Sequence, residues 1–360
     1  MEPIKCKEFW SKQRVFVTGH SGFKGAWLCL MLKRLGAYVY GYSKGYPTQP
    51  ALLQQIDGDT LIDVSFLGGD VVDEDDVRYH LKQANPTVVM HLAAQAIVKD
   101  GFKDPQGTFL TNTIGTGNVL NACRDVPVEA ILVITTDKVY KDTSDYWAYR
   151  EIDELGAADP YSTSKACAEL VVDSYRKSFL QNTPLATARA GNCVGGGDWG
   201  YRVIPMIMSA LMNGKVPSIW DPYATRPWQS VLDCLSGYLR LVEYAYEDPS
   251  DYSGSWNFGP DADEIYTVGE VAQRLCASWD ASMEFEYVEC PVRYNLNVDL
   301  RLDSSKARKV LNWRPKWNLD AIIFDLIDWY SRYWGNRRST RSICEKSLDN
   351  YEDTICGKSL

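Results

Sequence analysis

The segment from Arg14 to Gly36 constrains the fold of this chain more than any other. It reads RVFVT, then GHSGFKG, then AWLCLMLKRLG, which predicts a buried strand, a turn with glycines at positions 19, 22 and 25, and a helix. In such a unit the glycines let the backbone approach a pyrophosphate, and the helix N-terminus offers unpaired N–H groups and a positive dipole end. Glycine triplets alone are weak signals because turns need glycine, but the strand before and the helix after predict a dinucleotide site.

Short apolar runs continue to alternate with helix-favouring stretches up to residue 190. Strands are predicted at 37–44, 65–70, 87–95 and 131–134, and residues 104–124 predict one of the helices between them. This alternation is typical of a parallel sheet with helices on both faces. We predict an α/β fold in which residues 1–190 form a Rossmann-type doubly wound parallel sheet that carries the catalytic residues. Residues 191–335 would form a smaller mixed α/β substrate domain, and residues 336–360 a polar tail.

Composition argues against several functional classes. With 360 residues, 45% of them hydrophobic, the chain is long enough for two structural units. Its net charge of −9 argues against a nucleic-acid-binding surface, which needs clustered Lys and Arg. No apolar stretch approaches the ~20 residues of a membrane span, and the N-terminus lacks the pattern of a signal peptide. The ten cysteines form no CxxC pair, which predicts a cytoplasmic protein with reduced thiols and no metal site.

The ends of the second and third predicted strands bear on the cofactor. Folds that bind NAD usually place an acidic residue at the end of the second strand, where it holds the ribose 2′-hydroxyl. Here the strand ends in Tyr42, Ser43 and Lys44, and Lys44 suits either a 2′-phosphate or a solvated loop. NAD and NADP therefore both stay open. Asp70, at the end of the third strand, is placed either to meet an adenine edge or to act as a loop or capping carboxylate.

Two sets of reactive side chains follow the fifth predicted strand. TTDK places Thr136, Asp137 and Lys138 just beyond residues 131–134, and Tyr161 and Lys165 form a YxxxK pair whose spacing puts both on one face of a helix. A phenol, with its ordinary pKa of ~10, needs a nearby ammonium to favour its phenolate, so this pair suits proton removal during an oxidation. YxxxK also occurs by chance, with the tyrosine as a half-buried core residue. After a glycine-rich half-domain and a strand-end hydroxyl, the pair indicates catalysis.

Together, GxxGxxG, LAAQ, the Thr-Asp pair and YxxxK resemble the extended short-chain dehydrogenase/reductase family over nearly the whole chain. Longer strings, FVTGHSGFKGAWL, TTDKVY, DPYSTSKACAEL, RAGNCVGGGDW, RPWQSVLDCLSGYL and WNFGP, are similar to those of its CDP-glucose 4,6-dehydratase branch. The resemblance implies NAD as the cofactor, with NADP not excluded. It implies cofactor contacts from Gly19, Gly22, Phe23, Lys24, Gly25, Ser43, Asp70, Val71, Leu92, Ala93, Ala94, Gln95, Asn112, Tyr161 and Lys165.

The reaction implied by this resemblance is an internal redox elimination on a nucleotide sugar, with CDP-glucose as the expected substrate. Tyr161 takes the proton of the sugar 4-hydroxyl, to which Thr136 hydrogen-bonds, while hydride passes from C4 to the nicotinamide. The 4-keto group acidifies the C5 proton, the C6 hydroxyl leaves as water with Asp137 as general acid, and hydride returns to C6. The product is a 4-keto-6-deoxy sugar, as used in deoxysugar and lipopolysaccharide O-antigen biosynthesis.

Lys138 stands where related dehydratases acting on other nucleotide sugars commonly carry a glutamate as base at C5, and the CDP-glucose branch carries lysine there. Three roles stay open. A neutral Lys138, with its pKa lowered by burial and by Lys165, would remove the C5 proton. A charged Lys138 would stabilise the enolate while water or another group acts as base. It could also form a purely structural ion pair with Asp137.

Beyond residue 190 the sequence becomes denser in glycine, tryptophan and proline, which suits a nucleotide-sugar pocket. Guanidinium and amide groups are expected to bind the diphosphate, although each could instead be a surface or domain-bridging group. The expected substrate contacts are Gln95, Asn192, Arg202, Arg226 and Arg293, with Asn192 and Arg226 ranked first. The stretch CPVRYNLNVDLRLD departs from the pattern expected of the branch, which leaves the exact nucleotide sugar open.

Two other functions share parts of this pattern. A 4-epimerase or 4-reductase needs the tyrosine, lysine and hydroxyl but has no demand for Asp137 as an acid, so the Asp137-Lys138 pair discriminates it. A non-catalytic dinucleotide sensor predicts a broken Tyr161/Lys165 pair, and here the pair is intact. The resemblance also implies a homo-oligomer, a dimer or tetramer, formed through the helix after Asp104 and the YxxxK helix. The polar tail would pack on a partner subunit or be loosely ordered.

Overall fold

A computed structural model provides the structure of the protein and describes residues 3–142, 147–289, 300–335 and 339–355. Its centre is a seven-stranded sheet in the order β11-β6-β5-β4-β1-β2-β3, in which every neighbouring pair is parallel. The chain order reverses between β1 and β4, which is the switch point of a doubly wound sheet, so this prediction is confirmed. The strands are β1 (Arg14–Thr18), β2 (Tyr38–Ser43), β3 (Val64–Leu67), β4 (Val88–His91), β5 (Ala130–Ile134), β6 (Leu185–Ala190) and β11 (Gly254–Phe258).

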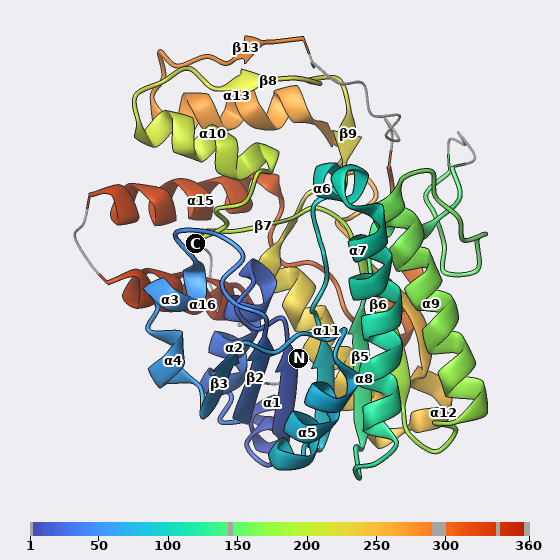
Figure 1. Cartoon of the computed structure of the whole chain (residues 1–360). Coiled ribbons are helices and arrows are strands. Elements are labelled where there is room, and N and C mark those ends of the chain that lie inside the picture. Colours follow the sequence, from blue (N-terminus) through green and yellow to red (C-terminus); the bar gives the residue numbers. More distant parts are fainter. Residues whose placement is uncertain (1–2, 143–146, 290–299, 336–338, 356–360) are drawn as a thin grey trace.

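Helices cover both faces of this sheet (Figure 1). Successive side chains of a strand point to opposite faces, so Val15 and Val17 of β1 join one core and Phe16 joins the other. The first core is covered by α1 (Pro3–Trp10), α2 (Phe23–Arg34) and α11 (Val231–Glu247). The second is covered by α5 (Glu74–Ala84), α8 (Gly115–Cys123) and α9 (Pro160–Ser178).

The start of α9 is fixed by its own sequence. Asp159 accepts a hydrogen bond from the Ser162 N–H at 3.0 Å, and Pro160 occupies the first helical position, where its missing N–H costs nothing. Tyr161 therefore lies in the first turn of α9, at the carboxyl edge of the sheet, and Lys165 follows one turn later.

A smaller group of helices and two-stranded sheets lies beyond the carboxyl ends of the central strands, at the top of Figure 1. It is mixed α/β, as predicted: β8 pairs with β13 in parallel and β9 with β12 antiparallel. However, α11 and β11 return to the main sheet from beyond residue 190, so the division of the chain at that residue stays a prediction. The group comprises α10 (Val203–Met212), β8 (Ser218–Ile219), β9 (Thr225–Arg226), β12 (Tyr266–Thr267), α13 (Val268–Trp279), β13 (Glu286–Tyr287) and α15 (Leu319–Trp334).

The helix predicted after Asp104 is interrupted. It begins as α7 (Pro105–Phe109), widens into one turn of π-helix, η1 (Leu110–Ile114), and continues as α8. Such single π-turns are frequent at functional sites because they redirect side chains within a helix. The remaining elements are α3 (Leu52–Gln55), α4 (Gly58–Leu61), α6 (Val98–Lys103), the 3-10 turn η2 (Asp137–Val139), β7 (Cys193–Val194), β10 (Gln229–Ser230), α12 (Pro249–Tyr252), α14 (Ser305–Val310) and α16 (Thr340–Ile355).

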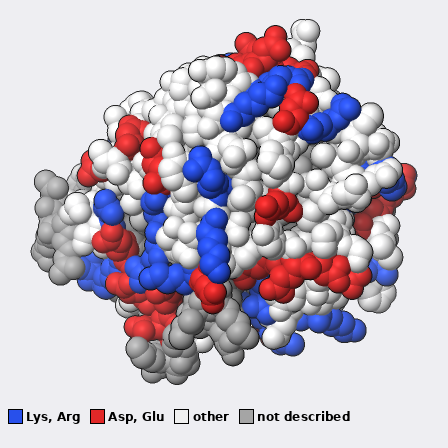
Figure 2. All heavy atoms as spheres, turned by 90° about the horizontal axis from the view of Figure 1, so that it is seen from below, with Lys and Arg blue, Asp and Glu red and all other residues white. Residues whose placement is uncertain are grey.

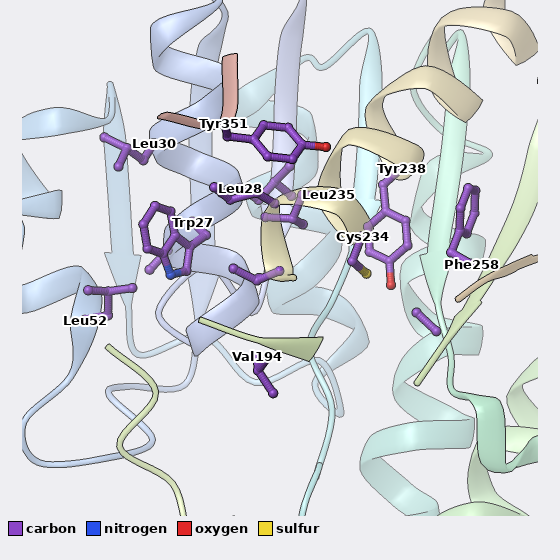
Figure 3. Close-up of a cluster of buried hydrophobic side chains, with 14 of the residues drawn as sticks. Trp27, Leu28, Leu30, Leu52, Val194, Cys234, Leu235, Tyr238, Phe258 and Tyr351 are labelled. Atoms are coloured by element: carbon purple, nitrogen blue, oxygen red, sulfur yellow. The ribbon is translucent and has the colours of Figure 1, made fainter. Parts of the chain in front are cut away.

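The expectation of a loosely ordered or partner-bound tail is wrong for residues 340–355. These residues form α16, whose buried face packs into the first core of the same chain. Tyr351 lies beside Leu28 and Leu235 (Figure 3), and its hydroxyl donates to Asp233 at 2.8 Å. The physical reason is an apolar face at helical spacing, Ile343, Leu348 and Tyr351, which mixed charge in the tail obscured.

The charged surface mixes both signs on the face opposite this smaller group. Figure 2 shows acidic and basic side chains interspersed there. Among the described helices, none combines the length and apolar character that crossing a bilayer requires.

Candidate active site

The turn between β1 and α2 forms a cradle of backbone. Gly19 has a φ of +74°, which favours glycine, and a Cβ on it would lie 2.6 Å from the Ala93 nitrogen. A Cβ on Gly25 would overlap the Gly19 carbonyl oxygen. No side chain caps α2 at Gly22, so the first N–H groups of the helix are available to an anion.

The LAAQ segment lines the opposite wall of the cradle. Leu92 and Ala93 each donate their N–H to Thr18 Oγ1 at 3.1 Å, which ties the end of β4 to the end of β1. Ala94 follows, half-buried, at the same wall. Gln95 is held by its backbone, and its buried Oε1 has no hydrogen-bond partner among the described residues.

Asn112, which is predicted to contact the cofactor, lies in the interior of the protein. It is fully buried in the π-turn η1, where its Oδ1 accepts from the Gln95 N–H at 2.8 Å. Its amide donates to the Gln95 carbonyl at 3.0 Å and to Ser164 Oγ at 2.9 Å. Asn112 therefore positions the Gln95 loop against α9.

The ribose end of the cradle is built from polar contacts within the chain. Ser43 is buried, with its hydroxyl 2.8 Å from His20 Nδ1. Lys44 pairs with Asp70 at 2.7 Å while remaining largely exposed. Partial burial raises the pKa of Asp70, but Lys44 and the Val72 N–H outweigh it and hold that pKa below its usual value.

Two other predicted contacts, Phe23 and Val71, are apolar. Phe23 is half-buried and opens α2. Val71 is buried, and its carbonyl accepts from the Asn118 amide at 3.0 Å.

Lys165 reaches the end of β5, and Tyr161 lies one turn before it on α9. Lys165 Nζ donates to the Ile134 carbonyl at 2.8 Å, which places the ammonium at the end of β5. Burial lowers the pKa of Lys165 to about 8, Lys24 acts in the same direction, and Glu169 opposes both. Lys165 is thus charged at neutral pH, although less strongly basic than a surface lysine.

The tight turn η2, which carries Asp137 and Lys138 and is capped by Thr136, begins just beyond Ile134. The Thr136 hydroxyl donates to Asp137 Oδ1 at 2.9 Å, and Lys138 Nζ approaches the same oxygen at 3.0 Å. Asp137 is 1% exposed, and its other oxygen, Oδ2, has no partner among the described residues. A Cβ on Gly191 would lie 2.8 Å from that oxygen and 2.5 Å from Pro227 Cγ, so a side chain at this position would collide with both.

The expected substrate contacts in the described residues lie on separate segments of the chain. Asn192 follows Gly191, and its carbonyl accepts from the Gln229 N–H at 3.2 Å. Arg202 pairs with Asp198 at 2.8 Å at the start of α10, and Arg226 donates to the Thr225 carbonyl at 2.6 Å from β9. Arg293 lies outside the described residues.

Two cysteines also meet near this site, which the sequence pattern did not indicate. Cys193 hydrogen-bonds with Cys234, and Lys24 hydrogen-bonds with Cys193. Burial raises the pKa of the Cys193 thiol, but Cys234 and the Lys24 ammonium outweigh it and lower that pKa to about 7. These residues come from three separate elements, so no local spacing could have revealed the contact. Figure 3 shows Cys234 beside Tyr238 on α11.

The cradle suits a dinucleotide. At Gly19 and Gly25 a larger side chain would collide with neighbouring backbone, and two buried oxygens, Gln95 Oε1 and Asp137 Oδ2, have no hydrogen-bond partner among the described residues. No group of three or more potential metal-ligating side chains lies together among the described residues.

Comparison with known proteins agrees with this geometry. The family model described as GDP-mannose 4,6 dehydratase matches residues 16–326. The chain belongs to this family of extended short-chain dehydrogenases/reductases, as its motifs predicted. More specifically, it is 37% identical over 351 residues to the CDP-glucose 4,6-dehydratase of Salmonella typhimurium, a match that covers 94% of this chain and 96% of that protein.

Solved structures show the same fold. An epimerase, Mth375 of Methanothermobacter thermautotrophicus, superposes with a TM-score of 0.79 at 22% identity, covering 92% of this chain and 96% of that one. A double mutant of the dTDP-glucose 4,6-dehydratase DesIV of Streptomyces venezuelae, with NAD bound, gives a TM-score of 0.76 at 21% identity, covering 89% and 98%. At these identities the likeness concerns the fold alone.

Proposed function

We propose that the chain is an NAD-dependent CDP-glucose 4,6-dehydratase, which converts CDP-glucose to CDP-4-keto-6-deoxyglucose and releases water. The observation that carries this proposal is Asp137, a buried carboxyl in which one oxygen has no partner among the described residues. It lies in the turn η2 just beyond Ile134, whose carbonyl accepts from Lys165. An epimerase or reductase needs the pair but has no use for that acid. The 37% identity to the Salmonella protein supports CDP-glucose as the substrate.

NAD, when bound, supplies a nicotinamide ring that can accept and return a hydride. The backbone of Gly19, Gly22 and Gly25 would hold its pyrophosphate at the start of α2. The ion pair of Lys44 with Asp70 supports NAD over NADP, because the charge of Lys44 is already matched. Lys165 would hold the ribose of the nicotinamide.

Tyr161 acts as the base of the oxidation. Lys165 is charged below pH about 8, and its ammonium favours the Tyr161 phenolate that removes the proton of the sugar 4-hydroxyl. The Thr136 hydroxyl, which donates to Asp137 in this structure, would turn to the same sugar oxygen. Both groups stand at the end of β5 and the start of α9, so a single sugar position can meet both.

Asp137 acts as the acid of the elimination. A proton on Oδ2, the oxygen without a partner among the described residues, would be given to the C6 hydroxyl as it leaves as water. Lys138 lies 3.0 Å from Oδ1, which supports a charged lysine that stabilises the enolate while water or another group accepts the proton from C5. Gln95, Asn192, Arg226 and Arg293 would hold the nucleotide diphosphate, while Arg202 would need to leave its pair with Asp198.

We also propose a cytoplasmic homo-oligomer that acts in deoxysugar biosynthesis, such as that of lipopolysaccharide O-antigen. Every cysteine among the described residues is a free thiol, which suits a reducing compartment. Large apolar side chains are exposed on the η1 and α9 helices, where a second copy would cover them: Leu110, Ile114 and Leu170.

Mass spectrometry of the products tests the proposed reaction. The protein would be incubated with NAD and, in separate tubes, with CDP-, UDP-, dTDP- and GDP-hexoses. Loss of one water from CDP-glucose alone is the expected result. An unchanged mass with an altered sugar configuration would show an epimerase, and no change in any tube would favour a non-catalytic sensor.

A further inference from the structure

A buried ion pair contacts the segment 135–140, called the catalytic turn below because it carries Asp137. The mechanism above assigns no role to this pair. Glu169 on α9 and Arg189 on β6 are each 3% exposed, and Arg189 Nη2 lies 2.8 Å from Glu169 Oε2. Burial raises the pKa of Glu169, but Arg189 and the hydroxyls of Thr135 and Thr187 outweigh it and hold that pKa below its usual value. The pair is therefore charged, although it is shielded from water.

The contacts of this pair reach both ends of the catalytic turn. Thr135, which precedes Thr136, donates its hydroxyl to Glu169 Oε1 at 2.5 Å. At the other end, Arg189 Nη1 donates to the Tyr140 hydroxyl at 3.0 Å, and that hydroxyl donates to Asn257 Oδ1 at 2.6 Å. The segment 135–140 is thus fastened at each end to one carboxylate-guanidinium unit.

The same pair is fixed to the body of the sheet by separate contacts. Thr187 of β6 donates to Glu169 Oε2 at 2.8 Å, and Arg189 donates to Ser255 Oγ of β11 at 2.9 Å. Glu169 also follows Lys165 by four residues, so the two side chains lie on one face of α9. The pair thereby links the turn that carries Asp137 to the helix that carries Tyr161 and Lys165.

Stability alone does not account for this arrangement. A buried ion pair gives little net stability over apolar side chains of similar volume, because both charges lose their hydration. A charged pair does, however, fix the orientation of the groups that hydrogen-bond to it. Two of these groups, the hydroxyls of Thr135 and Tyr140, lie at the two ends of the catalytic turn.

We propose that Glu169 and Arg189 are positioning residues that hold segment 135–140 against α9, so that the acid of the elimination and the base of the oxidation face one sugar. This inference rests on the dehydratase function proposed above. Neither residue touches the substrate space; both act through Thr135 and Tyr140.

Thr135→Val and Thr187→Val form a matched pair of test variants. Both threonines are buried, and each loses one hydroxyl that donates to Glu169, but only Thr135 adjoins the catalytic turn. We expect Thr135→Val, and likewise Tyr140→Phe, to lower kcat roughly ten- to hundredfold with little change in KM, because a small displacement of reacting groups is costly. Thr187→Val should keep kcat within about twofold of the wild type, because Arg189 and Ser255 still hydrogen-bond to Glu169.

Hydrogen exchange of the protein without NAD or substrate gives a second, independent readout. Amides of residues 135–141 should exchange faster in Thr135→Val and Tyr140→Phe than in Thr187→Val, at equal melting temperature. Equal kcat and equal exchange in the two threonine variants would overturn the inference. If the wild type releases water from no nucleotide sugar, the proposed function fails, but the exchange experiment still decides this inference.

Glu169→Gln adds a further test, the pH profile of kcat, which a purely structural role of Glu169 would leave unchanged. Because Glu169 opposes the fall in the pKa of Lys165, the neutral amide should shift the basic limb of the pH profile of kcat to lower pH. An unshifted profile would remove Glu169 from any influence on the catalytic lysine.

Discussion

At the scale of single residues, the two oxygens of Asp137 have different surroundings. Oδ1 accepts from Thr136 and Lys138, whereas Oδ2 is buried and has no partner among the described residues. In the proposed mechanism the two oxygens have separate tasks, because one anchors the turn and the other would give the proton.

Replacing Asp137 by asparagine should therefore stop the reaction after its first half. Asp137→Asn keeps the shape and the acceptor for Lys138 but has no acidic proton, so we expect turnover to fall roughly 10²- to 10⁴-fold. Bound NAD should still be reduced when CDP-glucose is added, which stopped-flow absorbance in the near ultraviolet would record. Tyr161→Phe is the contrasting variant and should lose both turnover and this absorbance change while still binding NAD. If Asp137→Asn gave no absorbance change, the residue would act earlier than proposed.

The residues of the site that sequence could indicate are those with a local pattern. Tyr161 and Lys165 lie four apart on one helix, and TTDK directly follows an apolar strand, so both could be placed at the same sheet edge. Ser43 could not be understood this way, because its hydroxyl meets His20 from another loop. That meeting requires Gly41, where a Cβ would overlap the His20 ring, and no spacing rule connects the three.

At the scale of elements, α15 carries two aspartates with opposite behaviour. Burial raises the pKa of Asp325 to about 7, and nearby Asp328 adds to this effect. Asp328 itself is affected by partial burial, which raises its pKa, but Arg332 and Lys346 outweigh it and hold the pKa below its usual value. Within one turn of helix, burial therefore disfavours the anionic form of Asp325, whereas neighbouring cations stabilise the anionic form of Asp328.

Asp325→Asn should stabilise the protein in alkaline solution. Between the ordinary pKa of 3.8 and about 7 the folded protein holds a proton that the unfolded chain releases, so stability falls as pH rises through this window and the full cost applies above it. We expect Asp325→Asn to raise the free energy of unfolding by about 2–4 kcal/mol at pH about 8 and by nothing near pH about 4. Urea denaturation at both pH values would measure this.

Asp328→Asn is the matched control. Its carboxylate is favoured in the folded state, so the substitution should destabilise the protein at the higher pH. The same sign for both variants would contradict the assignment of the two carboxyl groups.

Elements differ in how far sequence reveals them. The β1-turn-α2 unit and α9 have strong local signals, a glycine turn and an aspartate cap, and both form where predicted. The edge strand β11 has no such signal: WNF could belong to any short strand, and only its pairing with β6 brings it into the main sheet. In α16, Cys344 and Ser347 complete the buried face, so its apolar pattern is too sparse to stand out among the charges of the tail.

At the scale of the whole molecule, the exposed apolar side chains of η1 and α9 are the basis for predicting how the protein assembles. Leu110 is 40%, Ile114 51% and Leu170 61% exposed, on adjoining helices that show side by side as α7–α8 and α9 in Figure 1. Patches of this kind on a folded protein mark contact surfaces.

Leu170→Glu should therefore convert the protein to a monomer, because two copies would bury like charges against each other. Size-exclusion chromatography with light scattering would measure the mass. Phe324→Glu, at a site 59% exposed on α15, is the control and should leave the oligomer intact. A monomeric wild type would exclude this surface as an interface.

The packing of α16 against α2 and α11 has a consequence for biosynthesis. Arg34 of α2 pairs with Asp349 and Glu352, and Tyr351 lies beside Leu28, although about 300 residues separate the two helices. At ribosomal rates of roughly 5–20 residues per second, α2 waits roughly 15–60 s for the helix that covers it. During that interval the nascent chain exposes the apolar face of α2 that α16 later covers, even if the nucleotide cradle has already formed. Chaperones that bind exposed apolar surfaces would therefore bind this protein before its folding is complete.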